Sequence, residues 1–155
     1  MSRPSSAQSE GSGHPGRRVG HRRRRAARRL AIDLLYQADV TGQDPKQVME
    51  EWRRVRRDIV PYAEEIVTGV ESQRDHIDRI LGSHSEEWAV HRMAVLDRAI
   101  LRVACYELRA GVPPAVVINE AVEAAKEFST EDSGRFINGV LGKIARTLEG
   151  GAPNS

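Results

Sequence analysis

Residues 21–40 read HRRRRAARRLAIDLLYQADV, a stretch in which six arginines precede an apolar pattern with helical spacing. On a helix, where successive residues turn by about 100°, the small and apolar side chains of this stretch gather on one face. That face consists of Ala27, Ala31, Leu34, Leu35 and Ala38. The opposite face carries Arg22, Arg25, Arg29, Asp33 and Tyr36. The stretch therefore predicts an amphipathic helix over residues 22–40, with its arginines on the solvent face.

Helical spacing continues along the chain, and no segment shows the strict alternation of a half-buried strand. Asp44 and Pro45 have the residue types of a helix cap and a first helical position, and Gly111 has that of a helix stop. We expect seven helices, over residues 22–40, 44–60, 61–81, a short one from Ser85, 94–111, 115–128 and 134–148. The expected fold class is all-α, with the helices in two small packed bundles.

The domain organisation follows from length and composition. A chain of 155 residues with 39% hydrophobic content suits one domain with a modest core. We expect a single helical domain over residues 21–149. Its flanks, residues 1–20 and 150–155, are rich in Ser, Gly and Pro and are predicted to be disordered tails.

Charge is distributed unevenly along the chain. Residues 1–29 hold nine arginines and one acid, for a charge of +8, whereas the remainder holds 15 bases and 21 acids, for −6. An acidic body with a basic arm is typical of a protein that meets a polyanion with one part. Nucleic acid and an anionic membrane surface both fit. The membrane is less favoured, because the face opposite the arginines is alanine-rich and lacks bulky aromatic anchors.

No catalytic or metal-binding pattern emerges from the sequence. The acidic doublets are adjacent residues, which diverge by about 100° on a helix and so do not converge on one reacting atom. The five histidines lack the spacing of a helical zinc site. We therefore expect neither enzymatic activity nor a cofactor. The lone cysteine, Cys105, is expected in the core and indicates a reducing compartment, and no stretch suits a signal peptide or membrane span, so we expect a cytoplasmic protein.

The residue types of the first helix point to single-stranded RNA. Arg25 and Arg29 are predicted on the same face as Tyr36, and RNA-binding surfaces combine arginines for phosphates with aromatic rings for base stacking. A solvated helix end with no dedicated partner remains the alternative. Near the end of the chain, Phe128 and Phe136 lie beside basic residues, and Phe136 suits burial in the core as well as base stacking.

Four stretches together resemble the NusB family of bacterial transcription antitermination factors. They are RRAARRLAIDLLYQADV at 24–40, MAVLDRAILRVACYELR at 93–109, VVINEAVEAAKEFSTEDS at 116–133 and RFINGVLGKI at 135–144. The resemblance implies an all-helical fold without catalysis. It also implies pairing with NusE, a small-subunit ribosomal protein, and binding of the pair to the boxA element of nascent ribosomal RNA leaders. The resulting complex helps RNA polymerase to read through terminators.

The resemblance also implies a set of site residues. The expected RNA-binding residues are Arg22, Arg23, Arg24, Arg25, Arg28, Arg29, Tyr36, Lys126, Asp132, Arg135, Phe136 and Asn138. The expected partner-binding residues are His91 and Asp97. Two other functions stay open, namely an accessory RNA-binding module of a larger enzyme and a basic-tailed RNA chaperone or scaffold.

Overall fold

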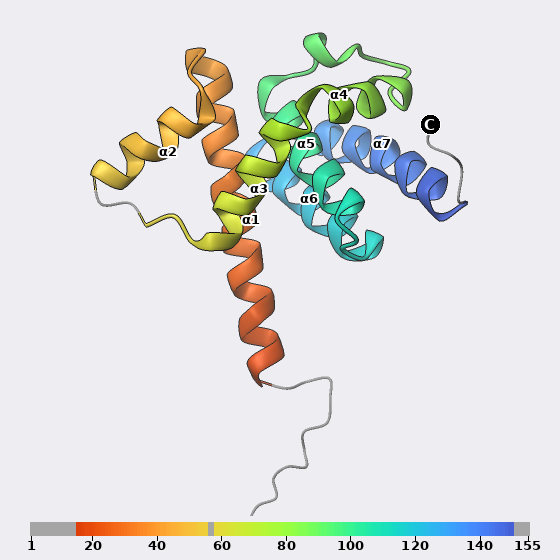
Figure 1. The fold of residues 1–155 in the computed structure, drawn as a ribbon. Helices are drawn as coiled ribbons and strands as arrows, with labels where there is room; N and C mark the ends of the chain where they lie inside the picture. Colours follow the sequence, from red (N-terminus) through yellow and green to blue (C-terminus); the bar gives the residue numbers. More distant parts are fainter. Residues whose placement is uncertain (1–14, 56–57, 151–155) are drawn as a thin grey trace, which may run out of the picture.

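The computed structural model describes residues 15–55 and 58–150, with side chains described from residue 20 onward. Within these ranges the chain forms seven α-helices, one 3-10 turn and no strand. The helices are α1 (Pro15–Thr41), α2 (Pro45–Arg54), α3 (Pro61–Ser72), α4 (Arg74–Ser83), α5 (Val95–Arg109), α6 (Pro114–Phe128) and α7 (Glu131–Glu149) (Figure 1). The predicted all-α class is confirmed.

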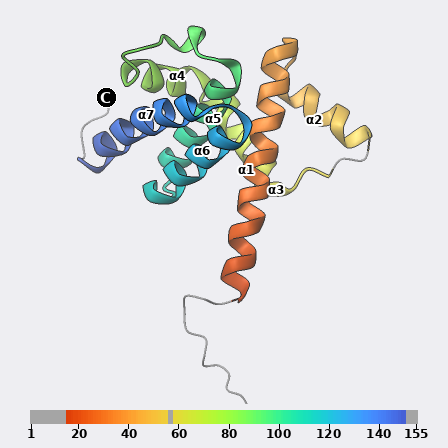
Figure 2. The ribbon, with the colours of Figure 1, turned by 180° about the vertical axis from the view of Figure 1, so that it is seen from behind.

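The helices form two groups that share one core. The first comprises α1, α2 and α3, and the second α4, α5, α6 and α7 (Figures 1 and 2). Helix α5 lies between them and packs on α1, α3, α4, α6 and α7. Because α5 is surrounded, ten of its fifteen residues are buried. Among them is Cys105, a free thiol whose pKa is raised to about 12 by burial, as expected of a core residue.

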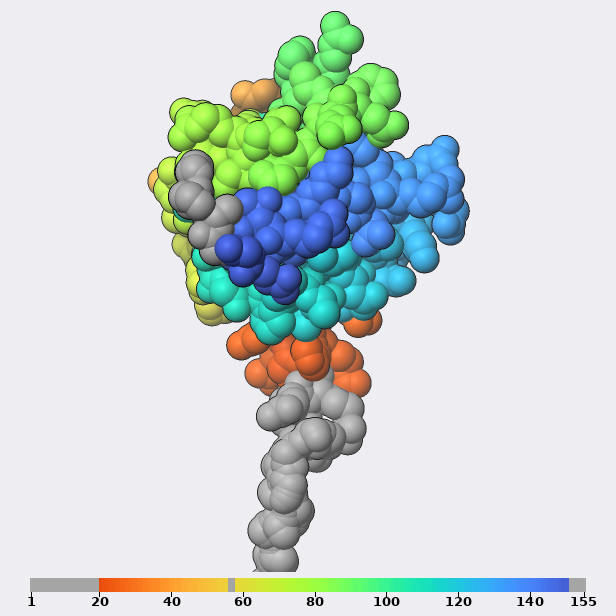
Figure 3. Space-filling view, turned by 90° about the vertical axis from the view of Figure 1, so that its right-hand side faces the viewer, coloured from red at the N-terminus to blue at the C-terminus, as the bar shows by residue number. Residues whose placement is uncertain are grey.

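Helix α1 is the longest element, and its first turns extend past the body formed by the other helices (Figures 1 and 3). It begins at Pro15, earlier than the predicted start at residue 22. The predicted apolar face is confirmed, because Ala27, Ala31, Leu34, Leu35 and Ala38 are all buried. The predicted disordered tails covered residues 1–20 and 150–155. Residues 15–20 belong to α1, and residues 1–14 and 151–155 lie outside the described residues.

Helix α2 begins as predicted and ends earlier than predicted. The Asp44 carboxylate accepts a hydrogen bond from the backbone N–H of Lys46 at 3.0 Å, and Pro45 opens the helix. The predicted continuation to residue 60 is wrong, because the helix stops at Arg54. Val60 has an extended backbone and precedes Pro61, whose ring disfavours a helical conformation in the residue before it.

The single helix predicted over residues 61–81 is two helices, α3 and α4, which meet at Gln73. The bend brings both halves onto the core, since Ile66 and Val70 before it and Ile77 and Leu81 after it are fully buried. Apolar spacing stays in phase across this bend, so the sequence pattern alone does not record it.

The short helix predicted from Ser85 is also wrong. The Ser85 hydroxyl donates to the backbone carbonyl of Trp88 at 2.8 Å and accepts from the backbone N–H of Trp88 at 3.3 Å. A serine that bonds the backbone in this way competes with the helical hydrogen bonds. Only a 3-10 turn, Val90–Arg92, forms in this connection. The number of helices matches the prediction because one predicted helix divides and another is absent.

Helices α6 and α7 form a hairpin, and α7 lies between α4 and α6 on one face of the molecule (Figure 3). Gly111, at a φ of 93°, and Pro113 separate α5 from α6. Thr130 caps α7, accepting a hydrogen bond from the backbone N–H of Ser133 at 3.0 Å. This cap starts α7 at Glu131, before the predicted residue 134.

Candidate nucleic-acid interface

The arginines of α1 from residue 22 onward fall into three environments. Arg22, Arg23 and Arg24 are exposed, and the first two have no ion-pair partner among the described residues. The Arg24 guanidinium lies 5.9 Å from the centre of the Tyr62 ring, at the start of α3. These side chains present charge to solvent at the end of the helix that projects from the body.

Arg25 and Arg29 face the acidic side of α6. Arg25 donates through Nε and Nη2 to the two carboxylate oxygens of Glu120, both at 3.0 Å, and this hydrogen bond raises the Arg25 pKa. Arg29 pairs with Glu127, and its guanidinium lies 5.3 Å from the centre of the Phe128 ring. Arg25 keeps 58% of its side chain exposed and Arg29 keeps 22%. Both guanidinium groups are thus oriented by α6 and still open to solvent.

Arg28 has a different environment from the rest of the stretch. It is 6% exposed, and its Nε donates to both oxygens of Glu107 in α5, at 2.8 and 2.7 Å. The Tyr62 hydroxyl donates to the same carboxylate at 2.5 Å, and burial, followed by this hydrogen bond, raises the Tyr62 pKa. The geometry therefore opposes the expectation that Arg28 contacts phosphate. The Arg28 side chain lies on the core side of α1, whereas those of Arg25 and Arg29 lie on the side that faces α6 and solvent.

Two aromatic rings are exposed near the paired arginines. Tyr36, 39% exposed, follows Arg29 by two turns on α1. Phe128, 50% exposed, ends α6 beside Arg29. The expected exposure of Tyr36 is observed, and both rings offer faces for stacking.

The second expected stretch spans the end of α6 and the start of α7. Lys126, Asp132, Arg135 and Asn138 are exposed, and Arg135 pairs with Asp132. Phe136 is partly buried and packs against the core, which leaves it one edge for another contact.

An open pocket of about 590 Å³ lies between α7 and the connection that precedes α5. Its lining combines the two expected sets, since Asp97 was expected to contact a protein partner and Asp132, Arg135 and Phe136 to contact RNA. Trp88, 48% exposed, also lines it. His91 is exposed on the 3-10 turn and is not among the lining residues.

Asp97 lies in the first turn of α5 at the wall of this pocket. It is 8% exposed, and its Oδ2 accepts a hydrogen bond from the Ser133 hydroxyl at 3.0 Å. Burial raises the Asp97 pKa, and the hydrogen bond from Ser133 opposes this rise.

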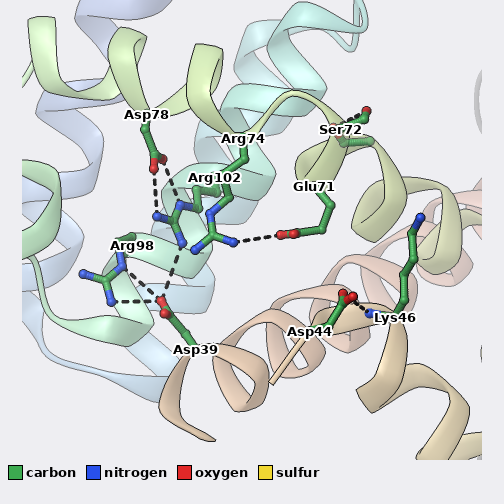
Figure 4. A network of polar contacts seen from close by, with 10 residues as sticks. Asp39, Asp44, Lys46, Glu71, Ser72, Arg74, Asp78, Arg98 and Arg102 are labelled. Carbon is green, nitrogen blue, oxygen red and sulfur yellow. Dashed lines mark hydrogen bonds and ion pairs between the residues drawn. The ribbon is translucent and has the colours of Figure 1, made fainter. Parts of the chain in front are cut away.

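Ion pairs of Arg98 and Arg102 join α5 to α1 and α4 (Figure 4). Arg98 donates through Nε and Nη2 to Asp39 of α1, at 3.0 and 2.9 Å. Arg102 donates to both oxygens of Asp78 in α4, each at 2.9 Å, and also pairs with Asp39. These contacts set the position of the first turn of α5, and with it that of Asp97.

No group of three or more His, Cys, Asp or Glu residues in the described part of the chain is arranged to hold a metal ion. Among the same residues, no helix is both long and apolar enough to cross a membrane.

A model of the NusB family matches residues 25–146 of the chain. The transcription antitermination protein NusB of Rubrobacter xylanophilus is 48% identical over 120 residues, a match that covers 76% of this chain and 86% of the relative. That of Saccharopolyspora erythraea is 43% identical over 145 residues, covering 85% and 97% respectively. The chain belongs to the NusB family. The predicted family is thereby confirmed.

Solved structures of the NusB family share this fold. NusB of T. maritima is 34% identical and superposes with a TM-score of 0.69, covering 79% of this chain and 90% of that one. A crystal structure of antitermination factors NusB and NusE in complex with double-stranded RNA contains a chain that is 27% identical, with a TM-score of 0.72. That match covers 81% of this chain and 98% of the other.

Several residues of the candidate site were not predicted from the sequence. They are Glu120 and Glu127, which pair with the arginines, and Ser133, which bonds Asp97. The spacing of Glu120, Glu123 and Glu127 does predict an acidic face on α6. The spacing does not predict which other helix this acidic face packs against, because that depends on the tertiary structure. Ser133 had no signal beyond its position two residues before Arg135.

Proposed function

We propose that this chain is an RNA-binding transcription antitermination factor of the bacterial cytoplasm. It binds the boxA element of nascent ribosomal RNA leaders together with NusE and promotes read-through by RNA polymerase. It acts by binding and has no catalytic step. Family membership supports this role, as does the solved complex that contains NusB, NusE and RNA.

The observation that carries the RNA-binding part is the combination of oriented arginines and open rings on one side of α1. Arg25 and Arg29 are oriented by α6, Phe128 leaves ring surface exposed beside Arg29, and Tyr36 does so two turns further along the same face of α1. Guanidinium groups contact phosphates and stack on bases, and aromatic rings stack on unpaired bases. A single strand that follows this surface meets both kinds of contact.

The RNA surface that we propose differs from the sequence expectation at two positions, because it adds Phe128, which lies beside Arg29, and leaves out one arginine. Arg22, Arg23, Arg24, Arg25 and Arg29 remain in it, and Arg28 is left out because Glu107 occupies its guanidinium in the core. The residues Lys126, Asp132, Arg135, Phe136 and Asn138 extend the surface from α6 to α7.

The partner surface that we propose is the pocket beside Asp97. It adjoins the RNA surface through Asp132, Arg135 and Phe136, so a protein seated there lies next to the bound strand. We include His91 in this surface because it precedes Arg92, a lining residue, on the 3-10 turn. Two ligands that touch the same residues are expected to influence each other's affinity reciprocally.

A titration of labelled boxA RNA tests this function. The full-length chain is titrated against boxA RNA, a scrambled RNA of the same composition and a boxA duplex, each with and without NusE. We expect preference for single-stranded boxA over scrambled RNA and tighter binding when NusE is present. Equal affinity for the two sequences would identify a general RNA chaperone instead. An absence of RNA binding would leave the arginines as a solvated helix end.

Activity itself is measured by transcription. In a reconstituted reaction with a boxA-containing template and a terminator, added protein should raise the fraction of read-through transcripts. A template with scrambled boxA is the control and should not respond.

A further inference from the structure

The two oxygens of the Asp97 carboxylate differ in their hydrogen bonding. Oδ2 accepts from Ser133, whereas Oδ1 is buried and has no hydrogen-bond partner among the described residues. A buried acceptor that is left unsatisfied costs stability unless a donor reaches it. Asp97 lines the 590 Å³ pocket, so a group that enters the pocket arrives next to this carboxylate.

The hydroxyl that holds Asp97 belongs to Ser133, in the first turn of α7. Ser133 also lies within hydrogen-bond distance of the Ser129 hydroxyl, at 2.9 Å, and its backbone N–H is held by Thr130 at 3.0 Å. The same turn stands between Lys126 and Arg135, two residues of the proposed RNA surface. Ser133 thus connects the proposed RNA surface, through its place in the chain, to Asp97 at the wall of the pocket, through its hydrogen bond.

We propose that Ser133 is a positioning residue for partner recognition, whose hydroxyl holds the Asp97 carboxylate at the pocket so that its second oxygen accepts an N–H donor of the protein partner. This inference rests on the proposed function, because it assigns a contact within the proposed partner surface. The terminal torsion of an aspartate is soft, and the hydrogen bond from Ser133 to Oδ2 restricts it, which keeps Oδ1 available as an acceptor at the wall of the pocket.

The Ser133 hydrogen bond also favours the ionised form of Asp97, in which the carboxylate is the stronger acceptor. Burial raises the Asp97 pKa and Ser133 lowers it. The other charged residues around the pocket are of both signs, namely Glu87, Arg92, Asp132 and Arg135. Loss of the Ser133 hydroxyl should therefore raise the pKa of Asp97 further. Partner binding should then fail at a higher pH as the solution is acidified.

The test measures NusE affinity of the full-length chain, without RNA, across mildly acidic to neutral pH. Ser133→Ala should weaken NusE binding roughly tenfold at neutral pH, the scale of a hydrogen bond to a charged group. Its binding should also decline at a higher pH than that of the wild type. Ser133→Thr keeps the hydroxyl and should restore both properties. Ser129→Ala removes a neighbour of Ser133 but not the donor to Asp97, and is the matched control.

A double-mutant cycle separates positioning from general loss of structure. In the Asp97→Asn background, Ser133→Ala should cause little further loss of NusE affinity, and the pH dependence that Asp97 contributes should vanish. The inference is wrong if Ser133→Ala leaves the affinity and its pH dependence unchanged, or if its effect is the same in the Asp97→Asn background. Wild-type protein that does not bind NusE at all would instead overturn the proposed function.

Discussion

Arg28 and Glu107 form a buried ion pair between α1 and α5, in which Nε of the arginine lies 2.8 and 2.7 Å from the two carboxylate oxygens. The side chains are 7% and 2% exposed. A stretch that looks uniformly basic therefore holds two kinds of arginine. Arg28 fastens the helix to the core, and its neighbours on the outer face are left for another ligand.

Arg28→Ala should destabilise the fold strongly and leave the salt dependence of RNA binding nearly unchanged. Removing one partner of a buried ion pair leaves an uncompensated charge, here on Glu107, at a cost of about 3 to 5 kcal/mol. Urea unfolding followed by circular dichroism measures the change in the free energy of unfolding. Arg22→Ala is the control, because an exposed substitution is expected to change stability by about 0.5 kcal/mol or less. Equal stability of the two variants would contradict the structural role of Arg28.

Gly69→Ala should also destabilise the protein, because α3 packs against the ring of Tyr106 at this position. A Cβ added to Gly69 would overlap that ring, lying 2.7 Å from Cζ and 2.9 Å from Cδ1. Overpacking of this kind costs about 1 to 3 kcal/mol. Thermal or urea unfolding is the measurement.

The control for this prediction is another helical glycine. Gly139 lies in α7, and apart from its chain neighbours and the adjacent backbone of α7, no heavy atom of the described residues comes within 4 Å of an added Cβ. Gly139→Ala should stabilise the protein by about 0.5 to 1 kcal/mol, through the lower helix propensity of glycine. In a Tyr106→Ala background, Gly69→Ala should lose most of its effect. Additive losses would show that the ring is not the source of the strain.

The pattern of residues predicted the elements better than their boundaries. The helical spacing of apolar residues along α1 correctly predicted its buried alanines and leucines, because the apolar face of an amphipathic helix packs against the core. The spacing did not predict the break between α3 and α4 at Gln73, because the apolar residues on either side of it keep one helical period. Ser85 showed the opposite error, since a serine followed by two glutamates suits a helix start and instead bonds the backbone of Trp88.

The candidate site was predictable to the extent that its residues carry a local signal. The exposure of Tyr36 follows from the helical period, since it lies opposite the apolar face. The burial of Arg28 does not, because it depends on a glutamate 79 positions later in the chain. Asp97 was expected from the resemblance to the family alone, and the hydrogen bond from Ser133 required the tertiary structure.

Glu120 and Glu127 should compete with RNA for the arginines of α1. Each carboxylate holds one arginine that we place at phosphate, and each also repels phosphate directly. Exposed ion pairs contribute about 0.2 to 1 kcal/mol. Glu120→Gln with Glu127→Gln should therefore raise RNA affinity several-fold. Glu50→Gln with Glu64→Gln removes two charges that pair with Arg53 on α2 and is matched in net charge. An equal gain in both double variants would mean that net charge, and not the local competition, sets the affinity.

Replacing Arg22, Arg23, Arg24 and Arg25 with alanine should flatten the salt dependence of RNA binding. Each phosphate neutralised on a single strand contributes about 0.7 to the slope of log affinity against log salt. The four substitutions should thus reduce the slope by up to roughly 2 to 3. Preference for boxA over scrambled RNA should change little, because phosphate contacts position a strand without specifying its sequence. A salt series on both RNAs measures the slope, and an unchanged slope would return this stretch to a solvated helix end.

Tyr36→Ala should show the reverse behaviour, with weaker binding and an unaltered salt slope. Stacking of a base on an aromatic ring is worth about 1 to 3 kcal/mol by alanine substitution, and the ring carries no charge to release counterions. Tyr36→Phe keeps the ring and should retain most of the affinity, so it separates stacking from loss of the hydroxyl. Because Tyr36 is 39% exposed, neither change should alter the free energy of unfolding by much.

Phe128→Ala tests the second ring in the same salt series, and it also removes the contact with Arg29. Its loss of affinity should therefore come with a small change in slope, which Tyr36→Ala should lack. Full affinity in both alanine variants would place the bases away from the α1–α6 side of the molecule.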